Sequence, residues 1–509
     1  MVSFLIALSS LPAFFLFIYS KFRSFLSKTI NRLPPGPPGL PIIGNLHQLN
    51  TSDLGDHLWR LSKRYGPLMS LRLGLIQTLV VSSADMAKEV LKTKDLVFCT
   101  RPVFTGTKKM SYNNNDVAWS PYGEYWRKMR KICILHLFSM KRVNSFCSVR
   151  EDEVFTMIDT IKTQILTNKE VNLSEIVMIL TSNIISRVAL GKRPYVYGGE
   201  QAERQEVRRF QELLLECQAL QVGLYYRDYF PLMGWLDKLN GSIARLEKNF
   251  KEMDECYQEI IDEHLNQDRP NKIQNDMVDI LLQLKEESGS PTDLTFDDIK
   301  GVLMDILLGG TETSASAVVW AMTLLMKNPE SLKKIQQEVR DLVGNKGKVE
   351  ECDLYKLNYL KAVIKETFRL YPVAPLLVPR ESRDRCILDG YDIPKKTLVY
   401  INAWAVGRDP NCWEKPEEFE PERFMGSNID YKGMNFELIP FGSGRRGCPG
   451  ILMGVVTIEL VLSNLVYSFN WELPEGTNEI NTLTTLGTIS HKKDALELVA
   501  KVYDHGRKN

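Results

Sequence analysis

Residues 441–450 read FGSGRRGCPG and place Cys448 at the start of a predicted helix that runs from about Pro449 to Tyr467. Two arginines precede the cysteine, and both neighbouring cations and a helix N-terminus lower the pKa of a thiol. Proline suits the first position of a helix, and the four glycines keep Cβ atoms away from a flat ligand that approaches the backbone. Backbone N–H groups exposed in this way can hydrogen-bond the sulfur. The stretch therefore favours a permanent thiolate ligand for iron, an arrangement that promotes O–O cleavage.

Two other interpretations of this stretch compete. Gly442, Gly444 and Gly447 form a literal G-x-G-x-x-G, the pattern of a dinucleotide-binding loop. Such a loop needs a strand directly before it and an acidic residue about 20 positions later. Here Pro440 precedes the loop, and the apolar helix that follows carries no acid in place. The other possibility is a purely structural free cysteine, which does not explain the crowding of arginines and glycines around Cys448.

The stretch also resembles the pattern F-x-x-G-x-R-x-C-x-G of the cytochrome P450 family and matches its five fixed positions. Other motifs occur in the family's order. They are the W-x-x-x-R pattern at Trp126–Arg130, the oxygen-binding helix at Gly309–Ser314, the E-x-x-R helix at Lys365–Arg369 and the P-E-R-F segment at Phe419–Phe424. The likeness covers nearly the whole chain. The stretch LPPGPPGLPIIGNLHQL at residues 33–49 resembles the plant microsomal A-type members of the family, the 71 clan of specialised metabolism.

This resemblance implies the cytochrome P450 fold, which is mainly α with small β-sheets (α+β), and one haem b with Cys448 as the axial ligand of the iron. The implied reaction inserts one oxygen atom from O₂ into a small lipophilic metabolite, such as a terpenoid, alkaloid, phenolic or coumarin, or oxime. NADPH electrons would arrive through a separate NADPH–cytochrome P450 reductase, because the chain carries no convincing nucleotide or flavin motif. Two alternatives compete: a haem-thiolate isomerase or dehydratase that needs no reductase, and a non-catalytic haem-binding protein.

Hydrophobic periodicity and terminator residues predict the main elements. Besides the helix after Cys448, the expected helices run from Phe296, with Thr295 as N-cap, to about Lys327, and from Leu357 to Leu370. Strand-like runs are Leu68–Leu73, Thr78–Ser82 and Thr397–Asn402.

The middle of the longest predicted helix carries the residues expected to handle dioxygen. Each of Gly309 and Gly310 costs about 1 kcal/mol relative to alanine in a helix interior, which indicates that space is needed there. Glu312 and Thr313 follow, and an acid beside an alcohol can relay the protons that dioxygen cleavage requires. The resemblance implies the same roles, with a dioxygen groove at the two glycines. The competing interpretation is a kinked core helix.

Two further residue sets follow from the resemblance. The candidates for binding the haem, besides Cys448, are Trp126, Arg130, Arg380, Phe441 and Arg446. An arginine guanidinium can donate two parallel hydrogen bonds to a carboxylate, and a tryptophan N–H can also donate to a carboxylate. The second set is a buried, non-catalytic triad that holds the thiolate loop, formed by Glu366, Arg369 and Arg423. Without the resemblance, Glu366 and Arg369 would be a surface ion pair of little energetic value.

Substrate-pocket residues are carried over by position in the family. They are Phe104, Val117, Trp119, Asp305, Leu308, Gly309, Ala374, Leu377, Val378, Leu486 and Gly487. Most are apolar, which is consistent with a small lipophilic substrate, although apolar residues also form the core of most proteins. The sequence leaves the substrate itself open.

The N-terminal part predicts a membrane anchor. Residues 1–20 are nearly free of charge and just long enough to cross a bilayer as a signal anchor. Residues 21–45 form a basic stretch and a stiff proline-rich elbow, followed by the monooxygenase domain at 46–509. We expect a single-pass protein of the endoplasmic reticulum membrane with a cytosolic catalytic domain. The alternatives are a cleaved secretory signal, for which no flanking pattern is evident, and a disordered linker in place of the elbow.

Charge and cysteine content narrow the possible partners. The net charge of +1 gives no reason to expect nucleic acid. The nine cysteines are scattered and form no C-x-x-C pair, which disfavours a disulfide framework or a zinc site. Basic residues are expected to face the acidic docking surface of the reductase on the thiolate side. They are Arg127, Lys128, Lys131 and Arg445.

Overall fold

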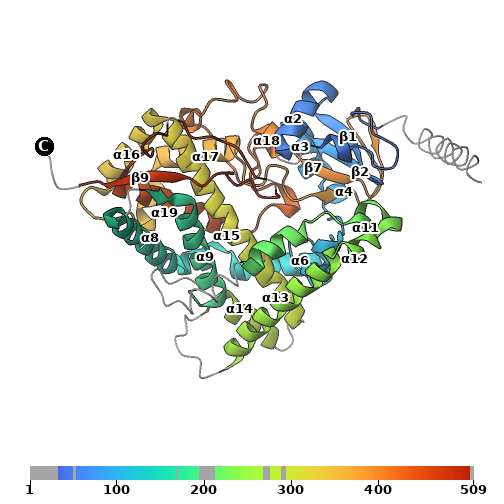
Figure 1. Ribbon diagram of the computed structural model, residues 1–509, viewed down its shortest axis with the longest axis horizontal. Coiled ribbons are helices and arrows are strands. Elements are labelled where there is room, and N and C mark those ends of the chain that lie inside the picture. The colour runs from blue at the N-terminus through green and yellow to red at the C-terminus, as the bar shows by residue number, and fades with distance from the viewer. Residues whose placement is uncertain are drawn as a thin grey trace, which may run out of the picture.

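The structure is a computed structural model that describes residues 33–49, 53–167, 170–193, 212–266, 275–287, 294–477, 479–485 and 487–504 (Figure 1). Its outline is triangular, with helices filling most of the molecule and the largest sheet at one corner. The mainly α fold with small β-sheets is confirmed. The expected anchor at residues 1–20 and the substrate candidate Leu486 lie outside the described residues.

Helices are the most numerous elements of the described chain. They are α2 (Leu54–Tyr65), α3 (Ala84–Lys88), α4 (Asp95–Phe98), α5 (Thr105–Met110), α6 (Glu124–Ile132), α7 (Met140–Ser145), α8 (Cys147–Thr167), α9 (Leu173–Leu190), α11 (Tyr226–Tyr229), α12 (Leu236–Leu239), α13 (Ser242–Leu265), α14 (Met277–Glu286), α15 (Phe296–Lys327), α16 (Pro329–Val343), α17 (Asn358–Leu370), α18 (Ala403–Val406) and α19 (Ile451–Ser468).

Three small sheets complete the fold. The four-stranded sheet has the order β1 (Leu68–Leu73), β2 (Ile76–Val81), β7 (Leu398–Ile401), β4 (Arg380–Glu381) and is antiparallel except for the parallel pair β2–β7. An antiparallel three-stranded sheet has the order β3 (Val171–Asn172), β9 (Glu497–Val502), β8 (Phe469–Glu472), and β5 (Cys386–Leu388) pairs with β6 (Tyr391–Ile393).

The proline-rich elbow lies against β1 from its first described residues onward. The Ser70 N–H donates to the Pro35 carbonyl at 2.9 Å, and the Asn45 N–H donates to the Arg72 carbonyl at 2.6 Å. The Asn45 side chain also donates to the Pro37 carbonyl at 3.0 Å. The disordered-linker interpretation is therefore wrong for residues 33–45.

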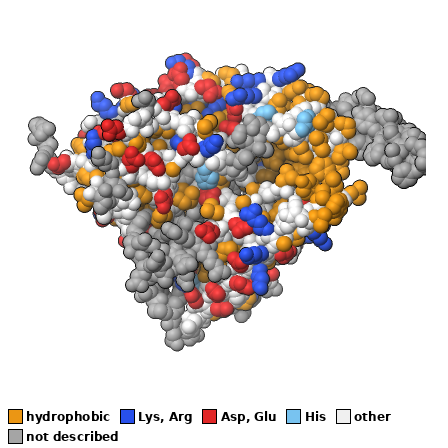
Figure 2. Space-filling view, in the orientation of Figure 1, with side chains coloured by type: hydrophobic (Ala, Val, Ile, Leu, Met, Phe, Trp, Pro, Cys, Tyr) orange, Lys and Arg blue, Asp and Glu red, His pale blue; other side chains and the backbone are white. Residues whose placement is uncertain are grey.

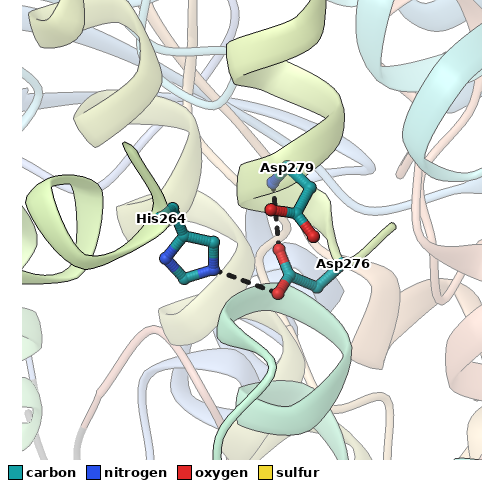
Figure 3. Close-up of side chains that lie close together, drawn as sticks. All are labelled: His264, Asp276 and Asp279. Atoms are coloured by element: carbon teal, nitrogen blue, oxygen red, sulfur yellow. Dashed lines mark hydrogen bonds and ion pairs between the residues drawn. The ribbon is translucent and has the colours of Figure 1, made fainter. Parts of the chain in front are cut away.

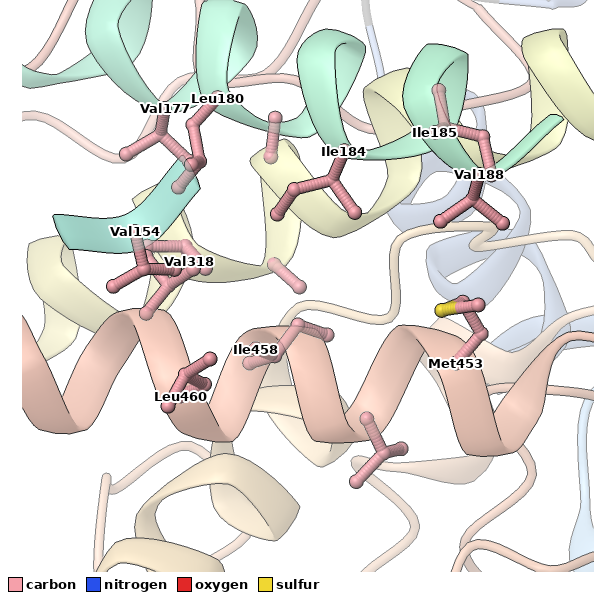
Figure 4. Packing of buried hydrophobic residues seen from close by; sticks show 14 of the residues in the cluster. Val154, Val177, Leu180, Ile184, Ile185, Val188, Val318, Met453, Ile458 and Leu460 are labelled. Carbon is pink, nitrogen blue, oxygen red and sulfur yellow. The ribbon is translucent and has the colours of Figure 1, made fainter. Parts of the chain in front are cut away.

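Helix α15 runs through the core with the bounds predicted from the sequence. Thr295 and Asp298 cap it reciprocally, since the Asp298 N–H donates to the Thr295 hydroxyl at 3.1 Å and the Thr295 N–H donates to the Asp298 carboxylate at 2.8 Å. Figure 4 shows apolar side chains of four helices meeting in this core, among them Val154 of α8, Ile184 of α9, Val318 of α15 and Ile458 of α19. Each such burial stabilises the fold by about 1.5–3 kcal/mol.

The helix after Cys448 begins later than predicted. Helix α19 starts at Ile451, with Gly450 as its N-cap, so Pro449 precedes the helix and is not its first residue. The first backbone hydrogen bond of the helix runs from the Gly454 N–H to the Gly450 carbonyl at 2.9 Å, and the Cys448 N–H donates to the Phe441 carbonyl at 2.9 Å, so Cys448 and Pro449 belong to the loop.

Three described helices are long and apolar enough to cross a membrane, namely α9, α15 and α19. In each, 67–72 % of the most apolar window is buried inside the protein. They are therefore core helices by their packing, as Figure 4 also shows.

Candidate active site

The loop around Cys448 is shaped by glycines. Gly442 and Gly444 have φ of 68° and 70°, values that disfavour residues with a side chain. A Cβ on Gly444 would lie 2.3 Å from the Leu91 carbonyl oxygen, so this glycine permits a close backbone approach. The expectation that all four glycines clear room for a ligand is therefore wrong for Gly444, which packs against protein.

The environment of Cys448 also differs from the sequence expectation. Burial raises the pKa of the Cys448 thiol, while the Gly450 N–H on the sulfur and the Arg130 charge act in the opposite direction. Arg445 pairs with Asp95 at 3.0 Å, and Arg446 donates to backbone carbonyls, so neither acts on the sulfur as the sequence suggested. A thiolate at this position would therefore need a bound metal ion, because a metal ion deprotonates a thiol that binds it.

Cys448 opens into a cavity of about 340 Å³, within the usual range for small-molecule sites. The Cys448 side chain is exposed and forms part of the lining of this cavity. Phe441 of the same loop and Gly309 and Thr313 of α15 also line the cavity, and the lining is mostly apolar.

Four arginines from separate parts of the chain line the same cavity. Arg446 donates to the Cys99 carbonyl at 2.7 Å and the Ser120 carbonyl at 2.6 Å, and Arg380 donates to the Ser443 carbonyl at 3.0 Å. Arg130 donates to the Gly447 carbonyl. The fourth, Arg101, was not identified from the sequence. Its guanidinium donates to the carbonyls of Ala118 (2.9 Å), Val378 (2.6 Å) and Pro379 (2.8 Å).

Among the described residues, Arg380 has an ion-pair partner, Asp95 at 3.4 Å, and no such partner is found for the other three arginines. Burial, followed by the like charge of Arg380, lowers the pKa of Arg446 to about 9. Burial, followed by the charges of Arg446 and Arg380, lowers the pKa of Arg101 well below its ordinary value. A buried cluster of cations is stabilised by an anionic ligand. The two carboxylates of a haem suit such a cluster, and together with the thiol and the apolar lining they give a set of groups that fits this cofactor.

Trp126 lies beside the arginine cluster. Its indole N–H donates to the Val117 carbonyl at 3.1 Å, so its donor is engaged by protein and not turned to the cavity. Its ring packs against the Arg446 guanidinium, 4.1 Å from the ring centroid. Trp126 therefore orients Arg446 in this structure.

The two glycines of α15 serve different purposes. A Cβ on Gly309 would meet no atom within 4 Å, whereas a Cβ on Gly310 would lie 2.6 Å from Ile185 Cγ1 of α9. Open space beside the helix is thus found at Gly309, and Gly310 lets α9 approach α15. The Thr313 hydroxyl donates to the Gly309 carbonyl at 2.5 Å. Glu312 is buried and contacts His491, a residue that no sequence motif indicated.

The triad outside the cavity is fully assembled. Arg369 donates to both Glu366 oxygens at 2.6 and 2.7 Å, and Arg423 donates to Glu366 at 3.0 Å. Glu366 and Arg369 have no exposed side-chain surface. The Arg369 guanidinium also donates to the carbonyls of Gly407 and Pro416, both at 2.6 Å, so it ties α17 to the segment that leads to the cysteine loop.

A family model described as cytochrome P450 matches residues 34–498. The chain belongs to the cytochrome P450 family. It is a cytochrome P450 monooxygenase of the plant type, as relatives named as synthases and hydroxylases also indicate. It is 48% identical to 5-OH-xanthotoxin synthase of Ammi majus, with 92% of this chain and 93% of the relative covered. It is 42% identical to strychnine-11-hydroxylase of Strychnos nux-vomica, with 98% and 97% covered.

A solved zebra fish cytochrome P450 with abiraterone has the same fold. Its TM-score is 0.73 at 22% identity, and the match covers 89% of this chain and 99% of the other. The family and fold imply a haem-thiolate cofactor, in agreement with the donor groups around the cavity.

Of the substrate candidates of this P450, six line the cavity. They are Val117, Asp305, Gly309, Ala374, Leu377 and Val378. The other described candidates, Phe104, Trp119, Leu308 and Gly487, are not among its lining residues. Phe104 packs against Tyr229 with ring centroids 6.1 Å apart, and Leu308 packs against the main core.

Among the described residues that line the cavity, Asp305 is the acidic one. Its carboxylate accepts from the Val117 N–H at 2.8 Å and the Ala118 N–H at 3.1 Å. Burial raises its pKa to about 6, against the effect of these two hydrogen bonds. Asp116 lies next to it, and burial together with the Asp305 charge raises the pKa of Asp116 as well. Each carboxyl of the pair therefore favours its protonated form more than an exposed aspartate does.

A second group of titratable side chains lies between α13 and α14, away from the cavity (Figure 3). His264 Nδ1 is 2.6 Å from the Ile260 carbonyl, and its Nε2 is 3.0 Å from Asp276. Asp276 in turn accepts from the Asp279 N–H at 3.0 Å as the N-cap of α14. These contacts explain the cluster as a cap that joins the two helices.

Proposed function

We propose that this P450 is a membrane-anchored monooxygenase that binds haem b through Cys448 and oxygenates a small lipophilic plant metabolite with NADPH electrons from a separate reductase. The observation that supports this most directly is that Cys448 and Thr313, from different elements, face one apolar cavity that is also lined by four arginines.

The haem, when bound, supplies the activation of dioxygen. Cys448 would hold the iron, and Arg101, Arg130, Arg380 and Arg446 would hold the propionates. Gly309 keeps the cavity open beside α15, because no atom lies within 4 Å of the position of its missing Cβ. Thr313 would release its hydrogen bond to the Gly309 carbonyl and, with Glu312, deliver protons. The apolar lining excludes water from the substrate.

We propose a coumarin as the substrate class to test first. Relatives at 48% identity include 5-OH-xanthotoxin synthase of Ammi majus and 6,7,8-trihydroxycoumarin synthase of Pastinaca sativa. A flat, apolar ring system with a few oxygens suits an apolar cavity in which Asp305 is the acidic polar group. Because strychnine-11-hydroxylase is also a relative, alkaloids are the second substrate class to test.

The test uses microsomes that contain the full chain and a plant reductase. Xanthotoxin, other hydroxylated or methoxylated coumarins, and strychnine are incubated with and without NADPH, and products are identified by mass. We expect a gain of one oxygen atom that requires NADPH, and a reduced carbon-monoxide complex with the red-shifted Soret band of thiolate haem. Cys448→Ala should lose both. Product without NADPH would favour the isomerase or dehydratase, and the thiolate band in Cys448→Ala would refute the ligand assignment.

An exposed apolar surface supports the membrane location. Ile42 of the elbow, Leu75 at the β1–β2 turn, and Leu232 and Trp235 near α11 and α12 are 51–93% exposed. The Leu75 N–H donates to the Tyr229 carbonyl at 3.0 Å, so these segments adjoin. Figure 2 shows hydrophobic side chains gathered on this corner of the molecule. We propose that it dips into the endoplasmic reticulum membrane next to the anchor, with the tryptophan at the interface.

The two faces of α6 support the proposed reductase site. Arg130 points inward to the Gly447 carbonyl of the thiolate loop. Arg127 and Lys131, which share the other face at i,i+4, are exposed to solvent. We propose that this outer face, together with Lys128, meets the acidic surface of the reductase, because it is the protein surface next to the Cys448 loop. Arg445 contributes less, since Asp95 already neutralises it.

A further inference from the structure

Glu312 and Thr313 are adjacent in the chain but face different surroundings. Thr313 lines the cavity, whereas Glu312 is not among the lining residues of the described chain. Glu312 as a residue is only 7% exposed, and its carboxylate lies 2.9 Å from His491 Nε2. A proton that reaches Thr313 through Glu312 must therefore enter on the side of α15 that faces His491.

The backbone next to His491 is fixed to that same side of α15. The Ser316 hydroxyl and the Trp320 N–H both donate to the Ser490 carbonyl, at 2.7 and 2.8 Å. Glu312, Ser316 and Trp320 are spaced at i, i+4 and i+8 and share one face of the helix. The segment that carries His491 is thus held by two hydrogen bonds that do not involve the imidazole.

The imidazole lies between solvent and the buried acid. About 30% of the His491 side chain is exposed, compared with 10% of the Glu312 side chain. Nε2 can donate to the carboxylate, and the exposed part of the ring can exchange protons with water. Histidine is suited to such transfer because its two nitrogens can bind and release protons at ordinary pH.

We propose that His491 is a positioning residue for Glu312 and the residue through which solvent protons reach it. A proton from water binds Nδ1 while the Nε2 proton passes to the Glu312 carboxylate, so one positive charge moves inward and no electrons are transferred. Exchange of the partly exposed ring with water then restores the Nε2–H form. The inference rests on the proposed function, in which Glu312 and Thr313 supply protons for oxygen activation.

The test compares three variants of the full-length holoenzyme in membranes with a plant reductase. His491→Gln keeps an N–H that can donate to Glu312 but cannot relay a proton, and His491→Phe removes the donor. Ser316→Ala is the matched control, because it weakens the attachment of the same segment without touching the imidazole. The measurements are NADPH oxidation, peroxide release and product formation with xanthotoxin as probe, each in H₂O and in D₂O.

We expect coupled turnover to fall about tenfold in both His491 variants, less than the roughly hundredfold or more contributed by a direct general acid, because water retains other paths to Glu312. The solvent isotope effect should rise in both, and Ser316→Ala should resemble the unaltered protein. Unchanged turnover and isotope effect in His491→Gln would overturn the proposal. An equal loss in Ser316→Ala would also overturn it and assign His491 a structural role.

An independent measurement does not depend on turnover. The chain has six histidines, so ¹⁵N-histidine labelling of the carbon-monoxide form gives few signals, and the signal missing in His491→Gln identifies that residue. The Nε2 resonance should be that of a protonated nitrogen and should move in Glu312→Gln. A resonance that does not respond to Glu312→Gln refutes the contact. The proposed function fails separately, through loss of thiolate haem or of NADPH-dependent oxygenation in the unaltered chain.

Discussion

Alanine substitutions at the two adjacent glycines of α15 should have opposite effects on stability. In Gly310→Ala the new methyl would lie 2.6 Å from Ile185 Cγ1 and 2.7 Å from Cδ1, whereas carbon contacts are optimal at about 3.5–4.0 Å. Relieving an overlap of about 1 Å costs about 1–3 kcal/mol, and alanine returns about 1 kcal/mol of helix propensity. Gly310→Ala should therefore lower the free energy of unfolding by up to about 2 kcal/mol.

Gly309→Ala is the matched control. Nothing lies within 4 Å of the added methyl, so only the propensity gain of about 1 kcal/mol remains and the variant should be more stable. It should nevertheless turn over more slowly, because the methyl enters the cavity beside Thr313. The assay is guanidinium unfolding of the two holoenzymes followed by circular dichroism, with turnover measured on the same preparations.

The steric cause can be separated from other causes with a double-mutant cycle. Ile185→Ala removes Cγ1 and Cδ1 and leaves Cβ, which is 3.4 Å from the new methyl. In the Ile185→Ala background, Gly310→Ala should no longer destabilise the protein and should raise its free energy of unfolding by about 1 kcal/mol. If Gly310→Ala costs the same in both backgrounds, close packing of α9 on α15 is not the reason for this glycine.

Further predictions concern other parts of the molecule. Thr313→Ala should raise peroxide release per NADPH while the carbon-monoxide spectrum persists; unchanged coupling would favour a structural role for the hydroxyl. Glu366→Ala should lower stability by about 3–5 kcal/mol in chemical unfolding, because two buried arginines lose their partner; a loss below about 1 kcal/mol would contradict the buried geometry. Reversing Lys128 and Lys131 to glutamate should slow reductase-driven turnover at low salt but not at high salt, with peroxide-driven activity intact. For Asp305, the raised pKa means that the carboxyl stabilises the fold when protonated, so stability should fall as pH rises from about 4 through about 6 and should fall less in Asp305→Asn, in which Asp116 still titrates; an unchanged pH profile in that variant would exclude Asp305 as a cause.

Features set by short-range interactions were predicted well from the sequence. The bounds of α15 follow from a reciprocal cap at Thr295 and a proline just beyond its end, and both act on neighbouring residues. Strand β1 likewise has the predicted bounds, because an apolar run and the turn at Gly74 define it locally. Cys448 and Thr313 could also be named, because each belongs to a motif of fixed spacing, and both line the cavity.

Contacts between distant segments could not be predicted. Arg101 reaches the cavity only because the segment after α4 lies against Val378 and Pro379, about 280 positions later. His491 meets Glu312 for a similar reason, since Ser490 is held by α15 from 170 or more positions away. No pattern in either neighbourhood encodes these pairings, because they depend on how helices and loops pack.

The thiol shows why nearness in the chain can mislead about chemistry. Arg445 and Arg446 precede Cys448, yet the left-handed backbone at Gly442 and Gly444 turns the loop so that one guanidinium reaches Asp95 and the other reaches the Cys99 and Ser120 carbonyls. The cation that acts on the sulfur is instead Arg130, from α6. Burial outweighs Arg130 and the Gly450 N–H, so the protein groups around Cys448 raise the pKa of its thiol. If Cys448 holds the iron as proposed, binding would displace a proton from this thiol, and loading of the haem should become easier as pH rises.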